Sequence, residues 1–296
     1  MHPYARTKSE TVFHAVNAVL LVVVSLAFLI PFLMVLSTSF VSEAESARRG
    51  AFILVPQTFD LSAYKLIFSK SSALLGAYQV TLFRVAVGTT LNLVVTAMLA
   101  YGLAKRTLPG RNGIVTFIFV TMIFSGGLVP SFMLIDAMGL RNSVWVLVLP
   151  GLVSAWNMFI MRTFFLNIPP ELEESAVVDG ANAFTILWRI ILPVSLPSFA
   201  TIGLFYAVGH WNAWFDAAIY IDDQAKMPVQ MVMRNILLSG LMAQSDMPHD
   251  QLVEALPPPQ TLKSAVIIVC TLPIVVVYPF IQKYFVKGAM IGSVKG

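Results

Sequence analysis

Long stretches of apolar residues without charge run through this chain and restrict what it can fold into. Residues 12–36, for example, contain no aspartate, glutamate, lysine or arginine. Hydrophobic residues make up 57% of the sequence and charged residues only 11%, whereas a soluble domain carries about 25% charged residues. Since a helix needs about 20 apolar residues to cross a bilayer, the sequence predicts an all-α, polytopic integral membrane protein.

Six such segments can be placed along the 296 residues, and we expect them to form a single transmembrane domain, residues 1–296. The third segment contains Ser125-Gly126-Gly127 and then Pro130, so we expect its outer half to be broken or irregular. Such a break is tolerated in a bilayer only where it is buried in protein or lines a cavity. The predicted transmembrane helices are residues 12–36, 80–103, 114–135, 143–165, 192–217 and 264–285.

Lysine and arginine predict the orientation, because short cytoplasmic loops are enriched in both. With the N-terminus inside, most basic residues fall on the cytoplasmic side, and two longer segments, 41–79 and 221–262, fall outside. We therefore expect both termini and the loop at 167–193 to be cytoplasmic, and the first helix to remain uncleaved. The basic residues assigned to the inside are Arg6, Lys8, Lys105, Arg106, Arg111, Arg162, Arg189, Lys283, Lys287 and Lys295.

The loop at 167–193 contains an ordered series of helix start and stop signals. Pro169 and Pro170 can begin a helix, and the glutamates that follow them lie at the positive end of its dipole. Gly180 can adopt the positive φ that ends this helix, and Asn182 can cap the next one. The second helix has one apolar face, formed by Phe184, Leu187, Trp188 and Ile191. The pattern predicts a compact helical knob joined directly to a membrane helix.

The same loop contains a spaced motif. Glu174-Ser175-Ala176 is followed after three residues by Gly180, and after nine more by Ile190-Ile191-Leu192-Pro193. This pattern resembles the EAA loop (E-A-A-x3-G-x9-I-x-L-P) of ABC importer permeases, with Ser175 in place of an alanine. The alternative, an amphipathic helix lying on the membrane, explains neither Gly180 nor the distant Ile-x-Leu-Pro.

The resemblance implies that this loop docks on a separate ATPase. Glu174 would then bind a basic or polar group of the ATPase, and Gly180 would permit the turn. Phe184 and Leu187 would fill a groove of the ATPase. The residues that the resemblance assigns to coupling are Glu174, Ser175, Ala176, Gly180, Phe184, Leu187 and Pro193.

Further motifs resemble the carbohydrate-importing branch of this family, the maltose-type permeases. They are Pro56-x3-Asp60-x3-Tyr64, Leu99-Ala100-Tyr101 and Tyr278-Pro279-Phe280-x-Gln282-Lys283-Tyr284-Phe285. Two others, Gly126-Gly127-Leu128-x-Pro130 and Tyr206-Ala207-Val208-Gly209-His210-Trp211-Asn212, are similar to a narrower subgroup. That subgroup is associated with lipoprotein-type and polysaccharide-derived oligosaccharide uptake, alginate importers included.

The resemblance implies the fold and partners of a type I ABC importer permease with a cytoplasmic coupling helix. The partners would be a second, different permease, two ATPase subunits that bind ATP and Mg, and an extracytoplasmic solute-binding protein. The complex would carry an oligosaccharide across a bacterial cytoplasmic (inner) membrane. No P-loop, zinc motif or nucleophile elbow occurs in the sequence, so we expect no cofactor and no catalysis in this subunit. The net charge of +4 fits basic cytoplasmic loops better than a nucleic-acid surface.

Candidate substrate contacts combine hydrogen-bonding groups with flat apolar faces, as sugars require. They are Trp145, Asn157, His210, Trp211 and Asn212. Other interpretations remain open, since the cluster at 210–212 fits an interfacial aromatic belt and Asn157 fits a hydrogen bond between helices. Arg84 lies just inside the outer end of the second helix, so we expect it to reach to the surface. An acidic oligosaccharide would give Arg84 a further role.

The two outer segments contain candidate surface elements. Residues 61–68 suggest a short helix that packs against a partner permease. Residues 227–238 suggest an amphipathic element, and the resemblance implies that this loop contacts the binding protein. The alternative for segment 221–262 is a flexible connector, especially around Pro257-Pro258-Pro259.

Two other classes of function remain. An ion-coupled secondary transporter would need inverted repeats and acidic residues inside the membrane, and only Asp216 lies near the end of a predicted helix. A membrane scaffold without a transport role would tolerate the loss of Gly180 without loss of uptake.

Overall fold

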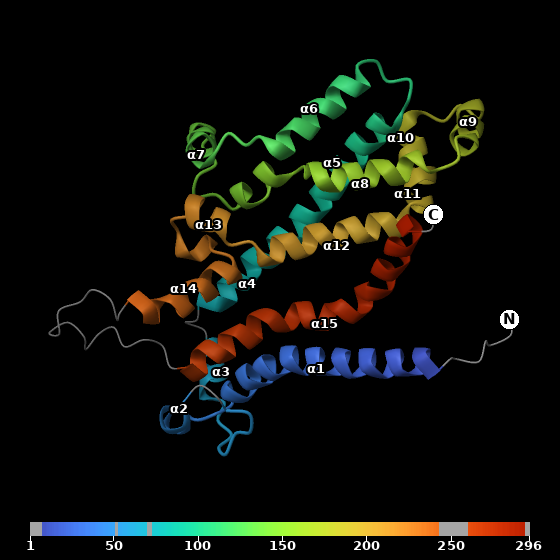
Figure 1. Ribbon diagram of the computed structural model, residues 1–296. Coiled ribbons are helices and arrows are strands. Elements are labelled where there is room, and N and C mark those ends of the chain that lie inside the picture. The colour runs from blue at the N-terminus through green and yellow to red at the C-terminus, as the bar shows by residue number, and fades with distance from the viewer. Residues whose placement is uncertain (1–7, 51–52, 70–72, 243–259, 294–296) are drawn as a thin grey trace. The chain divides into compact units, whose positions relative to one another are not determined.

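The computed structural model describes residues 8–50, 53–69, 73–242 and 260–293, and over these ranges its regular structure is helical (Figure 1). The chain forms two compact units, and each is described by itself. One comprises Met1–Ser72 and Asn235–Leu272, and the other Ala73–Arg234 and Pro273–Gly296. The predicted outer segment 221–262 is described only in part, because residues 243–259 with their three prolines lie outside the described residues.

Three described helices are individually long and apolar enough to cross a bilayer, namely Ser9–Thr38, Ala73–Ala104 and Gln260–Val277. Three bent pairs also qualify if each pair is taken as one span. Their bend angles are 113° for Arg111–Ile123 with Leu128–Ala137, 49° for Val144–Gly151 with Ala155–Leu166, and 89° for Ala183–Val194 with Leu196–Asn212. These elements coincide with the six predicted segments, while the count of six spans itself stays a prediction.

The first unit begins with α1 (Lys8–Thr38), whose described residues up to Leu33 are exposed. Two short helices follow, α2 (Glu43–Arg49) and α3 (Ser62–Ile67), and the second of these confirms the short helix expected at 61–68. The unit also contains the start of α15 (Gln260–Ser293). Helix α14 (Val229–Met242) covers most of the amphipathic element expected at 227–238, and it begins in the second unit and ends in the first.

A buried carboxylate organises the connection after α1. The Glu45 side chain is 1% exposed and accepts hydrogen bonds from the backbone N–H groups of Gln57 (3.0 Å) and Thr58 (2.8 Å). It also accepts from the Thr58 hydroxyl (2.5 Å) and from Arg49 Nη1 (2.6 Å). Together these donors, the Thr58 hydroxyl first among them, lower the pKa of Glu45 from 4.5 to about 2. The carboxylate therefore ties residues 57–58 to α2.

Because this pKa is lower in the folded chain, the stabilisation from Glu45 is fully present above pH 4.5 and is lost as the pH falls through about 2. At neutral pH we expect Glu45→Gln to accelerate hydrogen exchange at the amides of Gln57 and Thr58, because it removes the charge that they bind. Hydrogen–deuterium exchange read by mass spectrometry checks this. Glu43→Gln, at an exposed position on the same helix, is the matched control, and equal exchange in both variants would contradict the assignment.

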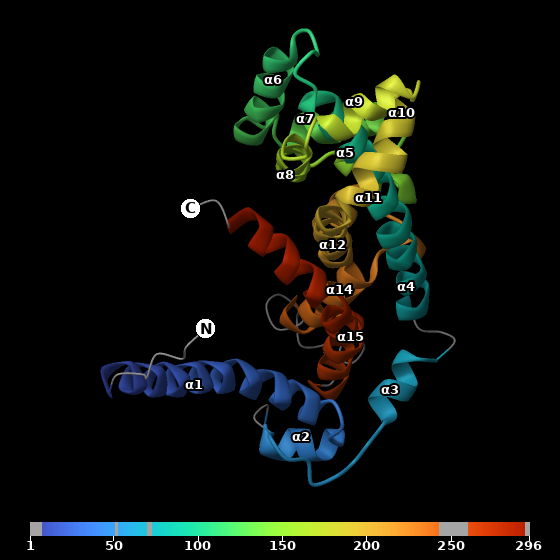
Figure 2. The same ribbon diagram turned by 90° about the vertical axis from the view of Figure 1, so that its right-hand side faces the viewer.

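The second unit is built around one continuous helix, Ala73–Ala104, made of α4 (Ala73–Phe83), the π-helical turn η1 (Arg84–Gly88) and α5 (Thr89–Ala104). Helices α6 (Arg111–Ile123) and α7 (Leu128–Ala137) come next, followed by the 3-10 turns η2 (Val144–Leu147) and η3 (Leu149–Gly151). Helix α8 (Ala155–Leu166) packs along α5, as Figures 1 and 2 show.

The chain then forms α9 (Glu171–Val178), α10 (Ala183–Ile186), the π turn η4 (Leu187–Ile191) and α11 (Leu192–Val194). Helix α12 (Leu196–Asn212) packs on α5 and α8, and α13 (Phe215–Tyr220) and η5 (Gln224–Lys226) complete the unit before α14. The main core lies where α5, α8, α12 and the segment 176–192 meet, and it includes Ala97, Tyr101, Met158, Ile191 and Ile202.

The structure confirms one expected irregularity and corrects two expected helices. The third predicted segment is broken between Ile123 and Leu128, as Ser125-Gly126-Gly127 indicated. The fourth is α-helical only from Ala155, because residues 144–151 form 3-10 turns. The fifth begins at Leu196 and not at 192, since the chain turns by 89° at Ser195. Pro193 and Pro197 flank this turn and lack the N–H groups that would continue a straight helix.

Candidate functional site

The first helix of the predicted knob ends on Gly180. The Gly180 N–H donates to the Val177 carbonyl (3.0 Å), and the Ala181 N–H donates to the Ala176 carbonyl (2.9 Å). These two bonds form a Schellman motif, which requires a left-handed residue, and Gly180 has φ +79°. The expected role of Gly180 in ending the helix is confirmed.

The second knob helix begins at Asn182, whose Oδ1 accepts a hydrogen bond from the Thr185 N–H at 2.8 Å, so the predicted cap is confirmed. The predicted apolar face divides into two groups. Leu187 and Ile191 are 3% and 1% exposed and belong to the core of the second unit. Phe184, by contrast, is 61% exposed. Leu187 therefore packs inside its own chain, so of the two residues predicted to fill a partner's groove, only Phe184 is accessible in this arrangement.

A polar contact also holds the knob to α5. Lys105, the C-terminal cap of α5, forms an ion pair with Glu173 of α9 and lies 4.4 Å from the centre of the Tyr101 ring. Burial lowers the pKa of Lys105, but the contacts with Glu173 and Tyr101 outweigh it, so its pKa is raised overall. With Ala176 also buried in the core, the base of the knob packs in the same core as α5 and α8.

The tip of the knob carries exposed apolar side chains next to a carboxylate. Val178 is 87% exposed, Val177 60% and Phe184 61%, and Glu174 is exposed on the same helix as the two valines. The Ser175 hydroxyl donates to the Leu172 carbonyl within its own helix (3.2 Å). Such an apolar surface with a polar edge is typical of an interaction site.

Elsewhere in the second unit, a buried polar cluster surrounds Arg84. The Arg84 guanidinium forms a bidentate ion pair with Asp216, in which Nη1 lies 3.1 Å from Oδ1 and Nη2 contacts Oδ2. Its Nε lies 3.3 Å from His210 Nδ1, and Nη1 also donates to the Ala213 carbonyl (3.3 Å). Arg84 is 4% exposed, so the expectation that it reaches to the surface is wrong. A charged partner within the chain replaces water as its neighbour.

The cluster continues through His210 Nε2 to Asn92 Oδ1 (2.8 Å), while Asn92 Nδ2 donates to the carbonyls of Gly151 (2.6 Å) and Leu152 (3.0 Å). A second bond joins Thr96 Oγ1 to the Tyr206 hydroxyl (2.8 Å). We did not identify Asn92, Thr96 or Tyr206 as candidates from the sequence. The signal was nevertheless present, because Arg84, Gly88, Asn92 and Thr96 repeat every four residues within an apolar segment.

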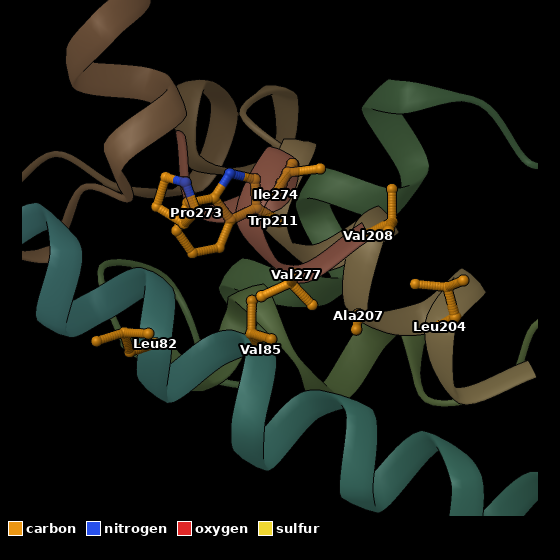
Figure 3. Close-up of a pocket in the computed structure, with 9 residues that line it drawn as sticks. All are labelled: Leu82, Val85, Leu204, Ala207, Val208, Trp211, Pro273, Ile274 and Val277. Carbon is orange, nitrogen blue, oxygen red and sulfur yellow. The ribbon is translucent and has the colours of Figure 1, made fainter. Parts of the chain in front are cut away.

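The remaining candidate residues are dispersed. Trp211 is buried and lines an apolar pocket of about 260 Å³ between α4, α12 and α15, together with Leu82, Leu204 and Pro273 (Figure 3). This pocket offers almost no polar surface and so does not match the needs of a sugar. Asn157 is buried and Asn212 is exposed, whereas Trp145 is 43% exposed and packs edge-on against Phe83. Within the described residues no group of acidic, histidine or cysteine side chains could hold a metal ion.

Gly88 allows the close approach of His210, since a Cβ at this position would lie 2.5 Å from His210 Nε2. We expect Gly88→Ala to destabilise the purified protein by about 1–3 kcal/mol, because Asn92 and Arg84 hold the imidazole in place. Thermal unfolding in detergent checks this. Gly76→Ala is the matched control on the same helix, where a Cβ meets nothing within 4 Å, and an equal loss in both variants would contradict the prediction.

Apolar helices able to cross a bilayer, joined to a helical knob with its base in their core and an exposed apolar tip, define a polytopic membrane protein with an interaction surface. No family model matches the chain. It is 44% identical over 297 residues to Protein LplC of Bacillus subtilis (strain 168), covering 100% of this chain and 99% of that protein. It is 43% identical over 277 residues to the polygalacturonan/rhamnogalacturonan transport system permease protein YtcP of the same organism, covering 93% and 96%.

A solved structure supports the same relationship. The crystal structure of a bacterial ABC transporter involved in the import of the acidic polysaccharide alginate contains a chain with 30% identity and a TM-score of 0.84. The match covers 96% of this chain and 100% of the other. The protein belongs to the permease subunits of ABC sugar and oligosaccharide importers. It forms the membrane part of an ATP-driven importer, and proteins of this kind are not themselves enzymes.

Proposed function

We propose that the knob of residues 167–193 carries the motion of an ATPase to the transmembrane helices of this subunit. ATP, bound with Mg by two partner ATPases, would draw the knobs of two permeases together. The helices would then change from an inward-facing to an outward-facing arrangement, and hydrolysis would reset them. The observation that supports this most directly is the pairing of an exposed tip with a base buried in the core of α5 and α8.

Individual knob residues have distinct roles in this proposal. Phe184, Val177 and Val178 form the apolar docking surface, and Glu174 binds a basic or polar group of the ATPase. Ala176 and Leu187 secure the base by packing, while Gly180 sets the turn and Pro193 lies beside the bend into α12. Ser175, whose hydroxyl is satisfied within α9, leaves the docking surface to its neighbours.

The assembly that we propose contains a second, different permease and an extracytoplasmic solute-binding protein that delivers the oligosaccharide. The knob and both termini lie in the cytoplasm, where ATP is available, and the membrane is the bacterial cytoplasmic membrane. The basic residues Lys105, Arg106 and Arg111 lie together in one short loop, and Lys105 pairs with Glu173 of the knob, so they support this orientation.

For the substrate we propose an acidic oligosaccharide. One relative is named for transport of polygalacturonan and rhamnogalacturonan, and the solved structure is that of an alginate importer. All three polymers contain sugar carboxylates. The predicted pathway residues Trp145, Asn157, His210, Trp211 and Asn212 remain our candidates, with Trp145 and Asn212 exposed and the others buried in the single chain.

The proposed import function can be tested by measuring the ATPase activity of the copurified complex in liposomes. The activity is compared with and without binding protein that is loaded with oligosaccharide. We expect stimulation by the loaded protein, and a several-fold loss of that stimulation in Gly180→Ala, because an alanine with positive φ costs about 1–2 kcal/mol. Gly102→Ala, at a position with equal space and no positive φ, is the control. Uptake driven by an ion gradient without any copurified ATPase would contradict the proposal.

Alanine substitutions can distinguish the role of the exposed side of the second knob helix from that of its buried side. We expect Phe184→Ala to leave stability within about 0.5 kcal/mol, because the ring is exposed, and to reduce copurification of the ATPase. We expect Leu187→Ala to lower stability by about 2–5 kcal/mol, because it opens a cavity in the core. Thermal unfolding and pull-down of the ATPase measure both effects. Normal copurification in Phe184→Ala would show that the docking surface lies elsewhere.

A further inference from the structure

We propose that Arg84 is a specificity-determining residue that binds a carboxylate of the sugar substrate, and that Asp216 occupies this position when substrate is absent. Trp214 and Arg234 lie beside the same turn and would contact the sugar ring and its charge. This inference rests on the proposed import of acidic oligosaccharides and assigns residues to the recognition of the acid group.

The geometry around Arg84 is that of a carboxylate site. Nη1 and Nη2 of the guanidinium face the two oxygens of Asp216 side by side, which is the paired arrangement that arginine forms with carboxylates in general. The remaining groups are fixed independently of Asp216, since Nε contacts His210 and Nη1 also donates to the Ala213 carbonyl. A sugar carboxylate has the same charge and shape, so it can replace that of Asp216 without rearranging Arg84.

The exposure of the two partners shows from which side a substrate would come. The Arg84 side chain is 5% exposed and that of Asp216 is 28% exposed. Asp216 therefore covers the guanidinium on its accessible side. It belongs to α13, a helix that begins directly after Trp214, so a rotation of one side chain at the start of a short helix uncovers Arg84.

The turn before Asp216 also carries an aromatic ring, Trp214, and a second cation from α14 lies over that ring. The Arg234 guanidinium lies 4.2 Å from the centre of the Trp214 ring, and Trp214 is partly exposed. Among the described residues, no carboxylate forms an ion pair with Arg234, so its charge is available to an anionic ligand. This cation on a partly exposed aromatic ring, two residues before Asp216 in the chain, fits a sugar acid better than a neutral sugar.

The test measures uptake and ATPase stimulation by the complete complex in liposomes, with binding protein and two probes. One probe is an oligogalacturonide and the other is its methyl-esterified counterpart, which has the same rings without the charges. The first variant is Arg84→Lys, which keeps the positive charge but loses the paired N–H donors of the guanidinium. The second is the double variant Arg84→Met with Asp216→Leu. The control is Asp223→Asn with Lys226→Gln, which removes an exposed ion pair from the same unit.

We expect the acid-to-ester ratio of kcat/KM to fall about tenfold or more in both Arg84 variants and to remain unchanged in the control, because a hydrogen-bonded carboxylate partner is lost. The same binding protein is used throughout, so its own preference cancels in the comparison. Thermal unfolding is recorded for each variant, and Arg84→Lys remains informative if the double variant does not fold.

A purely structural ion pair would give a different result, because replacement of both partners by apolar residues is often neutral for stability. Equal changes for acid and ester, or no change, would overturn the inference and leave the importer standing. If the wild-type complex transported the ester but not the acid, the inference about Arg84 would also be overturned. If no sugar stimulates the wild-type complex, the proposed function fails as well.

Discussion

The absence of water inside a bilayer is the constraint on which this structure depends, because backbone groups and buried charges there need partners within the protein. The Ala73–Ala104 helix shows how the chain meets this demand. Arg84 is neutralised by Asp216, and Asn92 is satisfied by His210 and by two carbonyls. At the C-terminal end of the helix, the Leu103 carbonyl accepts from Arg111 Nε (3.0 Å) and Arg162 Nε (2.9 Å). Except for Arg111, these partners come from distant parts of the sequence, so they also fix which helices are neighbours.

The same helix connects the two regions of functional interest. Its π turn carries Arg84 at one site, and its C-terminal cap, Lys105, holds Glu173 of the knob at the other. Between them, α5 packs on α8 and α12 in a core that also includes Ala176 and Leu187. Displacement of the knob therefore acts on a packed set of helices and not on a loose connection.

The sequence predicted well those features that depend on local backbone chemistry. Gly180, Asn182 and the break at residues 125–127 were predictable because a positive φ, a helix cap and a glycine-rich interruption are determined by a few neighbouring residues. The bend at Ser195 and the burial of Leu187 were not, because an apolar residue at a helical spacing can face lipid, core or partner equally well. Arg84 was misplaced for a related reason, since its partner Asp216 lies far along the chain and no local pattern joins them.

The exposed tip of the knob has a consequence for how such a complex is made. Val178 and Phe184 present large apolar surfaces on a subunit that has not yet met its partner. Leaving apolar surface in water costs about 25 cal/mol per Å², so an orphan subunit is the less stable form and a target for aggregation or degradation. The surface that we propose to dock on the ATPase would thus also link the survival of each permease to the supply of its partner during biogenesis.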